Sequence, residues 1–230
     1  MKSAFIVTSA INTNLGLFDI ETRIQQTNRT LCSIHDYAPN SKIIFVEGGE
    51  KSNDQYVIDF FKDVKSKSCL FGITNELGIP SNFGPSKSLN DVILTKRALE
   101  SLINNKFKVD RIFRISGRYQ LSPVFDLKVY EQDNIKNKFV FKKKDKSYIP
   151  DSKIEYCYQS RLWSFPYEKA EETLFYLEKM IIDLIEAIKN KEYLDFEHVL
   201  YKNIPQNEIH ELDLIHVFGV ITSNGHIVYD

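Results

Sequence analysis

The sequence predicts an α/β protein built on a wound, mostly parallel sheet, and three observations lead to this prediction. Short apolar runs suited to buried strands alternate with segments of helical periodicity over residues 1–120. The apolar runs end in small or polar residues, as a strand does when it delivers a loop to the edge of a sheet. The remainder mixes short β-like runs with one long helix, which is typical of an α+β portion. We expect one composite domain over 1–230, with halves at 1–126 and 127–230.

The first half opens with strands and helices in alternation. Residues 4–8 are a short apolar run that predicts the first buried strand. A helix is expected over 20–38, because apolar residues recur on one face until Pro39 closes the segment. Residues 42–47 (KIIFVE) predict a second buried strand, which Gly48-Gly49 cuts off.

The first half then continues toward a third strand. A helix is expected over 53–64, where apolar residues again share one face. Residues 66–85 contain two prolines and three glycines, so an irregular segment is expected there. Another helix is expected over 88–103, and it leads into a strand at 111–115 that stops at the sequence SGRY of 116–119.

The second half is expected to combine short strands with two helices. The longer helix spans about 167–191, where apolar residues recur at spacings of four and three. A short helix is expected near 196–201. Short strands are expected at four places, the last two joined as a hairpin by Ser223-Asn224-Gly225: 139–141, 154–158, 214–221 and 226–229.

Charge and composition argue against several classes of protein. The 230 residues carry 30 Lys+Arg against 31 Asp+Glu, a formal net charge of -1, whereas a dedicated nucleic-acid binder is usually strongly basic. No apolar run approaches the roughly 20 residues that a transmembrane helix needs. The three cysteines are odd in number and lack metal-binding spacing, which favours a reducing compartment and a cytoplasmic location. The lysine-rich run 142–146 is either a solvated loop or a contact to anionic lipid.

Candidate binding residues follow each of the three predicted strands of the first half. In an open α/β sheet, ligands bind outside the carboxyl ends of the strands, near the point where the strand order reverses. The ends at 8–11, 47–49 and 116–119 carry polar, small or charged residues, which indicates a ligand cleft. The motifs GxGxxG, GxxxxGK[ST], GxSxG and HExxH are missing, so the dinucleotide, phosphate-loop, hydrolase and metalloprotease sites that they mark are disfavoured.

The order of motifs FIVTSAIN, ETRIQQTNRTLCSI, KIIFVEGG, KSLNDV and DRIFRISGRYQL resembles a nucleotide-sugar glycosyltransferase of the GT-A type. The sequence is particularly similar to small glycosyltransferases of bacterial surface-polysaccharide clusters and large viruses, which carry a K/R-I-S/T-G-R-Y element. FRISGRY is the most specific part, and the resemblance covers most of the chain. It implies a Rossmann-like, three-layer GT-A sandwich that moves a sugar from a nucleotide-diphosphate donor onto a glycan or lipid-linked acceptor.

The resemblance also implies which residues meet the nucleotide-sugar donor. Glu47, at the end of the second strand, is expected to read the nucleobase or ribose. Lys87 is expected to meet phosphate at the start of a helix, with Asn90 one turn on. The full donor-binding set implied by the resemblance is Thr8, Ser9, Ala10, Glu47, Lys87, Asn90, Ser116, Gly117, Arg118 and Tyr119.

The sequence departs from the GT-A pattern at its usual metal-binding element. The family places an Asp-x-Asp at the end of the central strand, whose carboxylates hold Mn²⁺ or Mg²⁺ on the diphosphate, but this chain has Ser116-Gly117-Arg118-Tyr119 there. Asp110 lies at the other end of that strand, about 16–17 Å away at the rise of a strand, so it cannot bind the same ion. Either the metal is held differently, or Arg118 and Lys87 offset the charge of the leaving diphosphate. Arg118 is alternatively a structural ion pair beneath the cleft.

The catalytic and acceptor residues are sought in the second half. The resemblance places an acidic residue near the acceptor at the short helix, where Glu197 and His198 are candidate general bases. Neighbouring helical residues diverge by about 100°, so we expect at most one of them to face the cleft, and both are alternatively surface residues. Arg161 and Trp163 are candidate acceptor contacts, although a tryptophan in a strand is also a common core residue.

Two other functions stay open at this point. A noncatalytic nucleotide- or glycan-binding module with the same fold is favoured by the missing Asp-x-Asp. A Rossmann-like methyltransferase would need a glycine-rich first loop, which residues 9–15 do not supply. The donor sugar, the acceptor, the metal requirement and the oligomeric state have no signal in the sequence.

Overall fold

The computed structural model describes residues 1–13, 16–73, 87–150, 152–221 and 225–230. In this described part, the main sheet has seven strands in the order β10-β6-β9-β4-β1-β2-β3. Their bounds, in chain order, are β1 Ser3–Ser9, β2 Lys42–Glu47, β3 Leu70–Ile73, β4 Arg111–Ser116, β6 Phe139–Lys142, β9 Leu162–Pro166 and β10 Ile209–Leu212.

The main sheet is mostly parallel. β1 pairs in parallel with both β2 and β4, β2 with β3, and β6 with β10. β9 is the exception, because it runs antiparallel between β4 and β6. The chain therefore builds outward from β1 to β2 and β3, and then returns to the other side of β1 with β4. The strand order reverses between β1 and β4, which is where an open α/β sheet places its ligand crevice.

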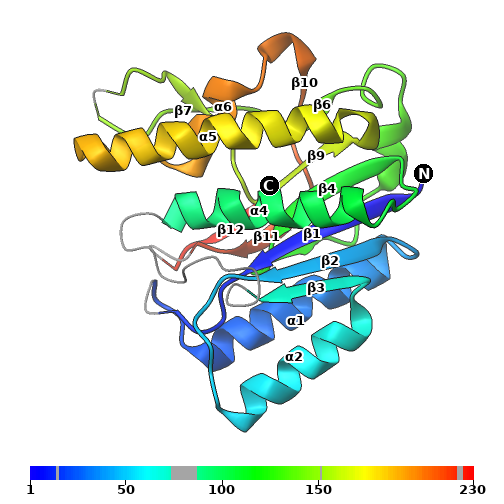
Figure 1. Ribbon diagram of the computed structural model, residues 1–230. Helices are drawn as coiled ribbons and strands as arrows, with labels where there is room; N and C mark the ends of the chain where they lie inside the picture. Colours follow the sequence, from blue (N-terminus) through cyan, green and yellow to red (C-terminus); the bar gives the residue numbers. More distant parts are fainter. Residues whose placement is uncertain (14–15, 74–86, 151, 222–224) are drawn as a thin grey trace.

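Helices cover both faces of the main sheet and make three layers (Figure 1). One face carries α1 (Ile20–Tyr37) and α2 (Gln55–Lys67), and the other carries α4 (Lys87–Asn104), α5 (Ala170–Asn190) and α6 (Phe196–Asn203). The alternation of β1 explains the two cores, since Phe5 and Val7 pack under α1 while Ala4 and Ile6 pack under α4. The three-layer α/β sandwich expected from the sequence is thus confirmed.

Smaller elements surround these layers. A three-stranded sheet has the order β12-β11-β5, and its β11–β12 pair is antiparallel, as expected for the predicted terminal hairpin. Residues 222–224, in the predicted turn, lie outside the described part. The remaining short elements are β5 Tyr119–Leu121, β7 Asp145–Lys146, β8 Tyr156–Cys157, β11 Val217–Val220, β12 Ile227–Tyr229, and the 3-10 segments η2 Leu127–Glu131, η3 Tyr167–Lys169 and η4 Gln206–Glu208.

Two edge strands of the main sheet, β3 and β10, were not expected from the sequence, and neither was the interior strand β9. β3 lies inside the segment 66–85 that was expected to be irregular, and residues 74–86 of that segment lie outside the described part. β10 lies just before the predicted strand at 214–221. Both are only four residues long and lie at opposite edges of the sheet. A strand this short has too few residues to show the alternation that reveals a longer strand.

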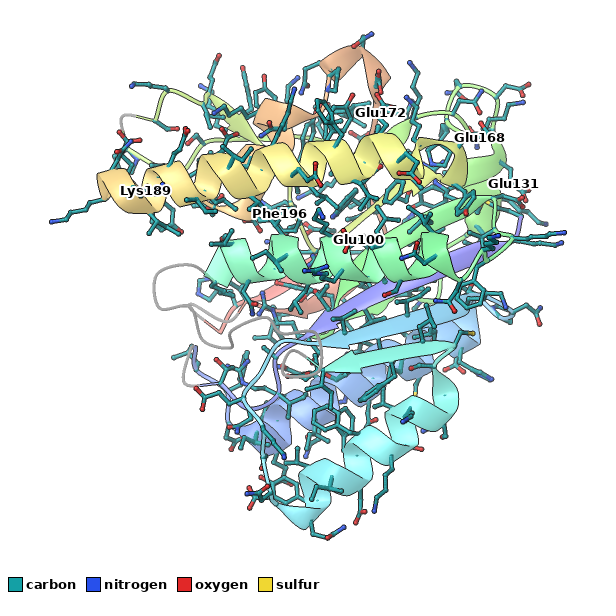
Figure 2. The ribbon with its side chains drawn as sticks, in the orientation of Figure 1. Glu100, Glu131, Glu168, Glu172, Lys189 and Phe196 are labelled. Carbon is teal, nitrogen blue, oxygen red and sulfur yellow. The ribbon has the colours of Figure 1, made fainter. Side chains whose placement is uncertain are left out.

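The second helical layer positions the short helix α6. Phe196, its first residue, is 1% exposed and belongs to the apolar cluster that α4 and α5 build over the sheet, and Figure 2 shows it between these two helices. Asp195 caps the helix, since its Oδ1 accepts a hydrogen bond from the backbone N–H of His198 at 3.1 Å. The start of α6 is therefore fixed relative to the main sheet.

Two features of the structure bear on the expectations about lipid contact and membrane-spanning helices. Lys142 and Lys144, in the lysine-rich run 142–146, form ion pairs with Asp230 and Glu211. These pairs leave less of the run's charge for anionic lipid. In the part of the chain that the structure covers, no helix combines the length and apolarity needed to cross a membrane.

Candidate active site

A pocket opens where the strand order reverses, at the carboxyl ends of β1 and β4. Gly117 follows β4, and its N–H donates to the carbonyl of Thr8 at 2.7 Å, which brings the two strand ends together. A Cβ at Gly117 would lie 3.1 Å from that carbonyl oxygen, so a larger residue would push the ends apart. The pocket is lined by Thr8, Ser9, Ala10, Thr13, Arg23, Gln26, Thr27, Gly48, Lys87, Asn90, Asp91, Leu94, Ser116, Gly117 and Arg118.

Three cations stand in this pocket, which we call the cationic compartment: Arg23 of α1, Lys87 of α4 and Arg118 after β4. Arg23 is buried and is held by hydrogen bonds to the carbonyls of Phe18 and Ala10, at 2.9 and 3.1 Å. Desolvation lowers the pKa of Lys87, and the nearby Arg118 lowers it further. The pKa of Arg23 is lowered for the same two reasons. Cations that disfavour one another's charge in this way mark a site suited to an anion such as a diphosphate.

A buried ion pair forms the floor between α4 and the sheet. Arg114 of β4 is bound to Asp91 of α4, and its Nη2 also donates to Thr8 Oγ1 at 2.7 Å. The Thr8 hydroxyl donates in turn to Asp91 Oδ1 at 2.9 Å. Although burial opposes ionisation, Arg114 and these hydrogen bonds hold the pKa of Asp91 below its usual value. Thr8 thus links β1 to α4 through hydrogen bonds, and these bonds fix α4 beside the pocket.

A second pocket adjoins the first and shares Lys87, Asp91 and Arg118 with it. We call it the acidic compartment, because the start of α6 brings Asp195 and Glu197 to its wall. Its lining residues are Lys87, Ser88, Asp91, Arg118, Tyr119, Tyr148, Gln159, Ser160, Arg161, Tyr193, Leu194, Asp195, Phe196, Glu197 and Ile221. The site therefore has two compartments of opposite character that meet at three shared residues.

Glu197 has the properties of a general base. Its Oε1 accepts a hydrogen bond from Ser160 Oγ at 2.6 Å, which orients the carboxylate. Burial raises the pKa of Glu197, and the neighbouring charge of Asp195 raises it further. A carboxylate with a raised pKa is a stronger base than a solvated one, so it can take a proton from a hydroxyl group more readily.

His198 faces away from this pocket. Its side chain is fully buried, with Nδ1 2.6 Å from Asp195 Oδ1 and Nε2 2.9 Å from Ser147 Oγ. It is absent from the lining of both compartments. The expectation that at most one of Glu197 and His198 faces the cleft is met, and the candidacy of His198 as the base is wrong because its ring is in the interior. Its place in the structure is to hold Asp195.

Glu47 also lies behind the pocket instead of lining it. It is 1% exposed, and its Oε1 accepts hydrogen bonds from the backbone N–H groups of Ile11 and Gly49, both at 2.7 Å. Burial raises the pKa of Glu47 to about 7, against the effect of these hydrogen bonds. The expected contact of Glu47 with nucleobase or ribose is therefore wrong in this structure. Instead, it braces the two loops that follow β1 and β2.

The other predicted donor residues fall into two groups. Tyr119 is 3% exposed and lines only the acidic compartment, so its expected place beside the donor is not where the structure puts it. Asn90 packs closely against Gly48: a Cβ atom added to Gly48 would lie 2.9 Å from Nδ2 of Asn90. The predicted residues that line the cationic compartment together are Thr8, Ser9, Ala10, Lys87, Asn90, Ser116, Gly117 and Arg118.

The two predicted acceptor residues separate. Arg161 lines the acidic compartment, where its guanidinium is bound to Asp230. Trp163 is 1% exposed and packs against Phe141 and Phe165 in the core under α4 and α5, so its expected acceptor contact is wrong. The core alternative for this residue holds, because β9 is an interior strand of the sheet with its tryptophan under the helical layer.

The residues described here do not make a metal site of the usual kind. No three His, Cys, Asp or Glu side chains gather closely enough to hold an ion within the described ranges. Asp110 accepts a hydrogen bond from the N–H of Lys2 at 2.6 Å, at the amino end of β4, which agrees with its exclusion. The metal requirement stays a prediction to be tested.

Several functional positions were missed from the sequence. Arg23 had a weak signal, as an arginine among apolar positions at the start of a helix. Asp91 stands within the quoted KSLNDV but is marked only by its long-range pairing with Arg114. Asp195 had a local signal, since an aspartate directly before a helix is a preferred N-cap.

Comparison with known proteins relates this fold to a glycosyltransferase. No family model matches the chain, and no curated protein matches it. Among solved structures, the chain resembles the crystal structure of the glycosyltransferase GlyE of Streptococcus pneumoniae TIGR4, with a TM-score of 0.52 and 14% sequence identity. The match covers 93% of this chain and 46% of GlyE, so the chain spans less than half of that protein's length. At this identity the likeness is one of fold: the chain has the GT-A-like α/β fold that its sequence predicts.

Proposed function

We propose that this protein is a glycosyltransferase that moves a sugar from a nucleotide-diphosphate donor onto a glycan or lipid-linked acceptor. The observation that carries the proposal is the pair of joined compartments at the switch point between β1 and β4. One holds Arg23, Lys87 and Arg118, and the other holds Glu197 as a candidate base. The two share Lys87 and Arg118, so an anionic leaving group and a deprotonated nucleophile would meet at the same boundary.

The cationic compartment suits the diphosphate of the donor. Arginine and lysine bind phosphate oxygens through charge-assisted hydrogen bonds, and arginine does so with two parallel donors. Because burial and the charge of Arg118 lower the pKa of both Lys87 and Arg23, a bound dianion would relieve the repulsion among the three cations. Thr8 to Ala10 and Ser116 to Gly117 form the walls against which the rest of the donor would lie.

The transfer itself follows from this placement. The acceptor hydroxyl lies in the acidic compartment, where Glu197 takes its proton as its oxygen attacks the anomeric carbon. The new carbon–oxygen bond forms while the bond from that carbon to the diphosphate oxygen breaks. The nucleoside diphosphate leaves with the electron pair, and Lys87 and Arg118 offset the charge that develops on it. This is a single displacement, so the product should have the inverted anomeric configuration.

A panel of nucleotide sugars tests the proposal. Thermal unfolding is measured with UDP-, GDP-, ADP- and dTDP-sugars, each with and without Mn²⁺, and transfer is followed as nucleotide release. We expect at least one donor to raise the Tm of the wild-type protein and of Glu197→Gln. Only the wild type should then release nucleotide in an acceptor-dependent reaction. The absence of any shift across the whole panel would reject the proposal, and a shift without release would instead favour a noncatalytic binding module.

A further inference from the structure

Two tyrosines stand exposed on the wall of the acidic compartment. Tyr148 is 56% exposed and Tyr193 is 68% exposed, although both line the same pocket as Glu197. Large apolar rings left in contact with water at a concave polar site mark a ligand surface more often than an accident of folding. The described contacts of the proposed transfer do not use either ring.

Both tyrosines lie beside the same carboxylate. The hydroxyl of Tyr148 donates to Asp195 Oδ2, while burial and the nearby charge of Asp195 raise the pKa of Tyr193. Asp195 is itself buried and hydrogen-bonded to His198. The His198 ring packs edge to face against the Tyr148 ring, with the ring centroids 5.2 Å apart. Anchoring at the hydroxyl restricts the rotation of the Tyr148 ring, and the side chains of Tyr148 and Tyr193 both stay more than half exposed. A ligand that stacks on them therefore loses little side-chain entropy on binding.

The charges around the rings select for a neutral ligand. Asp195 and Glu197 lie next to the two tyrosines, and hydrogen bonds from His198 and Tyr148 keep the pKa of Asp195 low despite its burial. Arg161 also lines this compartment, and Asp230 already binds it, while Lys87 and Arg118 stand at the boundary with the cationic compartment. A phosphate or carboxylate held at the rings would face these carboxylates. A sugar ring instead offers an apolar C–H face to the tyrosines and hydroxyl donors to the carboxylates.

Building on the proposed function, we propose that Tyr148 and Tyr193 form a stacking platform for the neutral terminal sugar of a glycan acceptor, next to Glu197. The acceptor class is thus a glycan with an uncharged non-reducing end, and the platform holds this end with a hydroxyl directed at the base. A lipid-linked acceptor would be bound through its sugar and not through its phosphate.

Direct binding tests the platform without relying on transfer. Saturation-transfer NMR is recorded with methyl β-D-glucopyranoside, methyl β-D-galactopyranoside and methyl N-acetyl-β-D-glucosaminide, and with farnesyl phosphate as a lipid-phosphate probe. We expect at least one glycoside to receive saturation on the protons of its C–H face. The Tyr148→Ala/Tyr193→Ala double variant should bind it about tenfold more weakly or worse. Tyr148→Phe, which keeps the ring but loses the anchor to Asp195, should lie between the two.

The controls separate the possible causes of failure. Tyr56→Ala removes a tyrosine of similar exposure, 51%, from α2 on the opposite face of the sheet, and should leave glycoside binding unchanged. An unchanged Tm shows that a variant is folded. Saturation transfer to no glycoside, equal transfer in the double variant, or loss of farnesyl phosphate binding alone would overturn the platform. Loss of the donor-induced shift across the nucleotide-sugar panel would instead reject the transferase while leaving the platform standing.

Discussion

The cationic and acidic compartments differ in how their charges are satisfied. In the acidic compartment each carboxylate has donors of its own: Asp195 has His198 and Tyr148, and Glu197 has Ser160. In the cationic compartment, Arg118 lowers the pKa of both Lys87 and Arg23 through repulsion. The acidic compartment is therefore preorganised before any ligand binds, whereas the cationic compartment gains stability when an anion enters.

The two compartments also come from different parts of the fold. The cationic one is formed mainly by the carboxyl ends of parallel strands and by α1 and α4, all within the first half of the chain. The acidic one is assembled from the residues before β9, the start of α6 and Tyr148. The formal net charge of -1 thus hides a local separation of opposite charges over one crevice. A net charge near zero argues against a protein that binds large polyanions over a basic surface. It does not argue against a local pocket of cations that binds one small anion.

The largest expected effect comes from the base of the acidic compartment. Glu197→Gln keeps an oxygen for the Ser160 hydroxyl but cannot accept a proton, so the rate of sugar transfer should fall about 10²- to 10⁴-fold. The donor-induced rise in Tm should persist, because donor binding depends on the other compartment. Glu178→Gln is the matched control, since that side chain is 58% exposed on α5. A variant with unchanged kcat would remove Glu197 from the mechanism.

A second glutamate sharpens the comparison, because Glu47 is buried behind the cationic compartment and does not line it. Its pKa is raised from 4.5 to about 7, so between these values the folded state keeps a proton that the unfolded state has lost. Stability should therefore fall as the pH rises through this window. The Glu47 contribution is about 3 kcal/mol, at about 1.4 kcal/mol per pKa unit.

Urea denaturation at pH 5 and pH 8 measures this effect. The free energy of unfolding of Glu47→Gln should depend on pH less steeply than that of the wild type, by about 2.5 kcal/mol between the two pH values, because unfolded Glu47 is already partly ionised at pH 5. The comparison between variant and wild type removes the contributions of the other titrating groups. Parallel pH profiles for the two proteins would show that Glu47 is ionised at low pH in the folded state.

The next effect concerns Arg118, which lines both compartments. Arg118→Ala should weaken donor binding about 10- to 100-fold, as expected for the loss of hydrogen bonds to a charged ligand. Titration of the donor by calorimetry measures this directly. Arg97→Ala is the control for the loss of one positive charge, because Arg97 is half exposed on α4 and pairs with Glu100. Equal losses in the two variants would mean that Arg118 acts only through long-range charge and does not contact the donor.

The sequence predicts the fold and the cationic compartment well, because both depend on local patterns. Apolar runs and helical periodicity locate β1, β2, β4 and α4, and parallel strands necessarily bring their carboxyl ends to one edge. The placement of β9 between β4 and β6 depends instead on long-range pairing. No local signal indicates that pairing, so the core position of Trp163 stayed one alternative among two.

Side-chain direction explains the remaining differences. Glu47 shares the parity of Ile43 and Phe45, which face α1 and α2, so the alternation of β2 already directs it away from α4. His198 lies three residues after the N-cap Asp195, which turns its ring back to the cap. The pairing of Asp91 with Arg114 joins a helix to a strand and is visible only once the two are packed together.

The smallest expected effect tests how one compartment tunes its own base. Asp195→Asn keeps a good N-cap for α6 but removes the negative charge that raises the pKa of Glu197. Transfer requires ionised Glu197, so the rate should rise with pH through the pKa of this residue, and in Asp195→Asn this rise should move to lower pH. The measurement is the pH dependence of kcat for both proteins at saturating donor. If Asp195 only supports the helix, the variant should lose activity equally at every pH, and the position of the rise should not move. A shift of the kcat profile toward lower pH would therefore show that the charge of Asp195 raises the pKa of Glu197. An unshifted profile with lower activity would show that Asp195 only supports the helix.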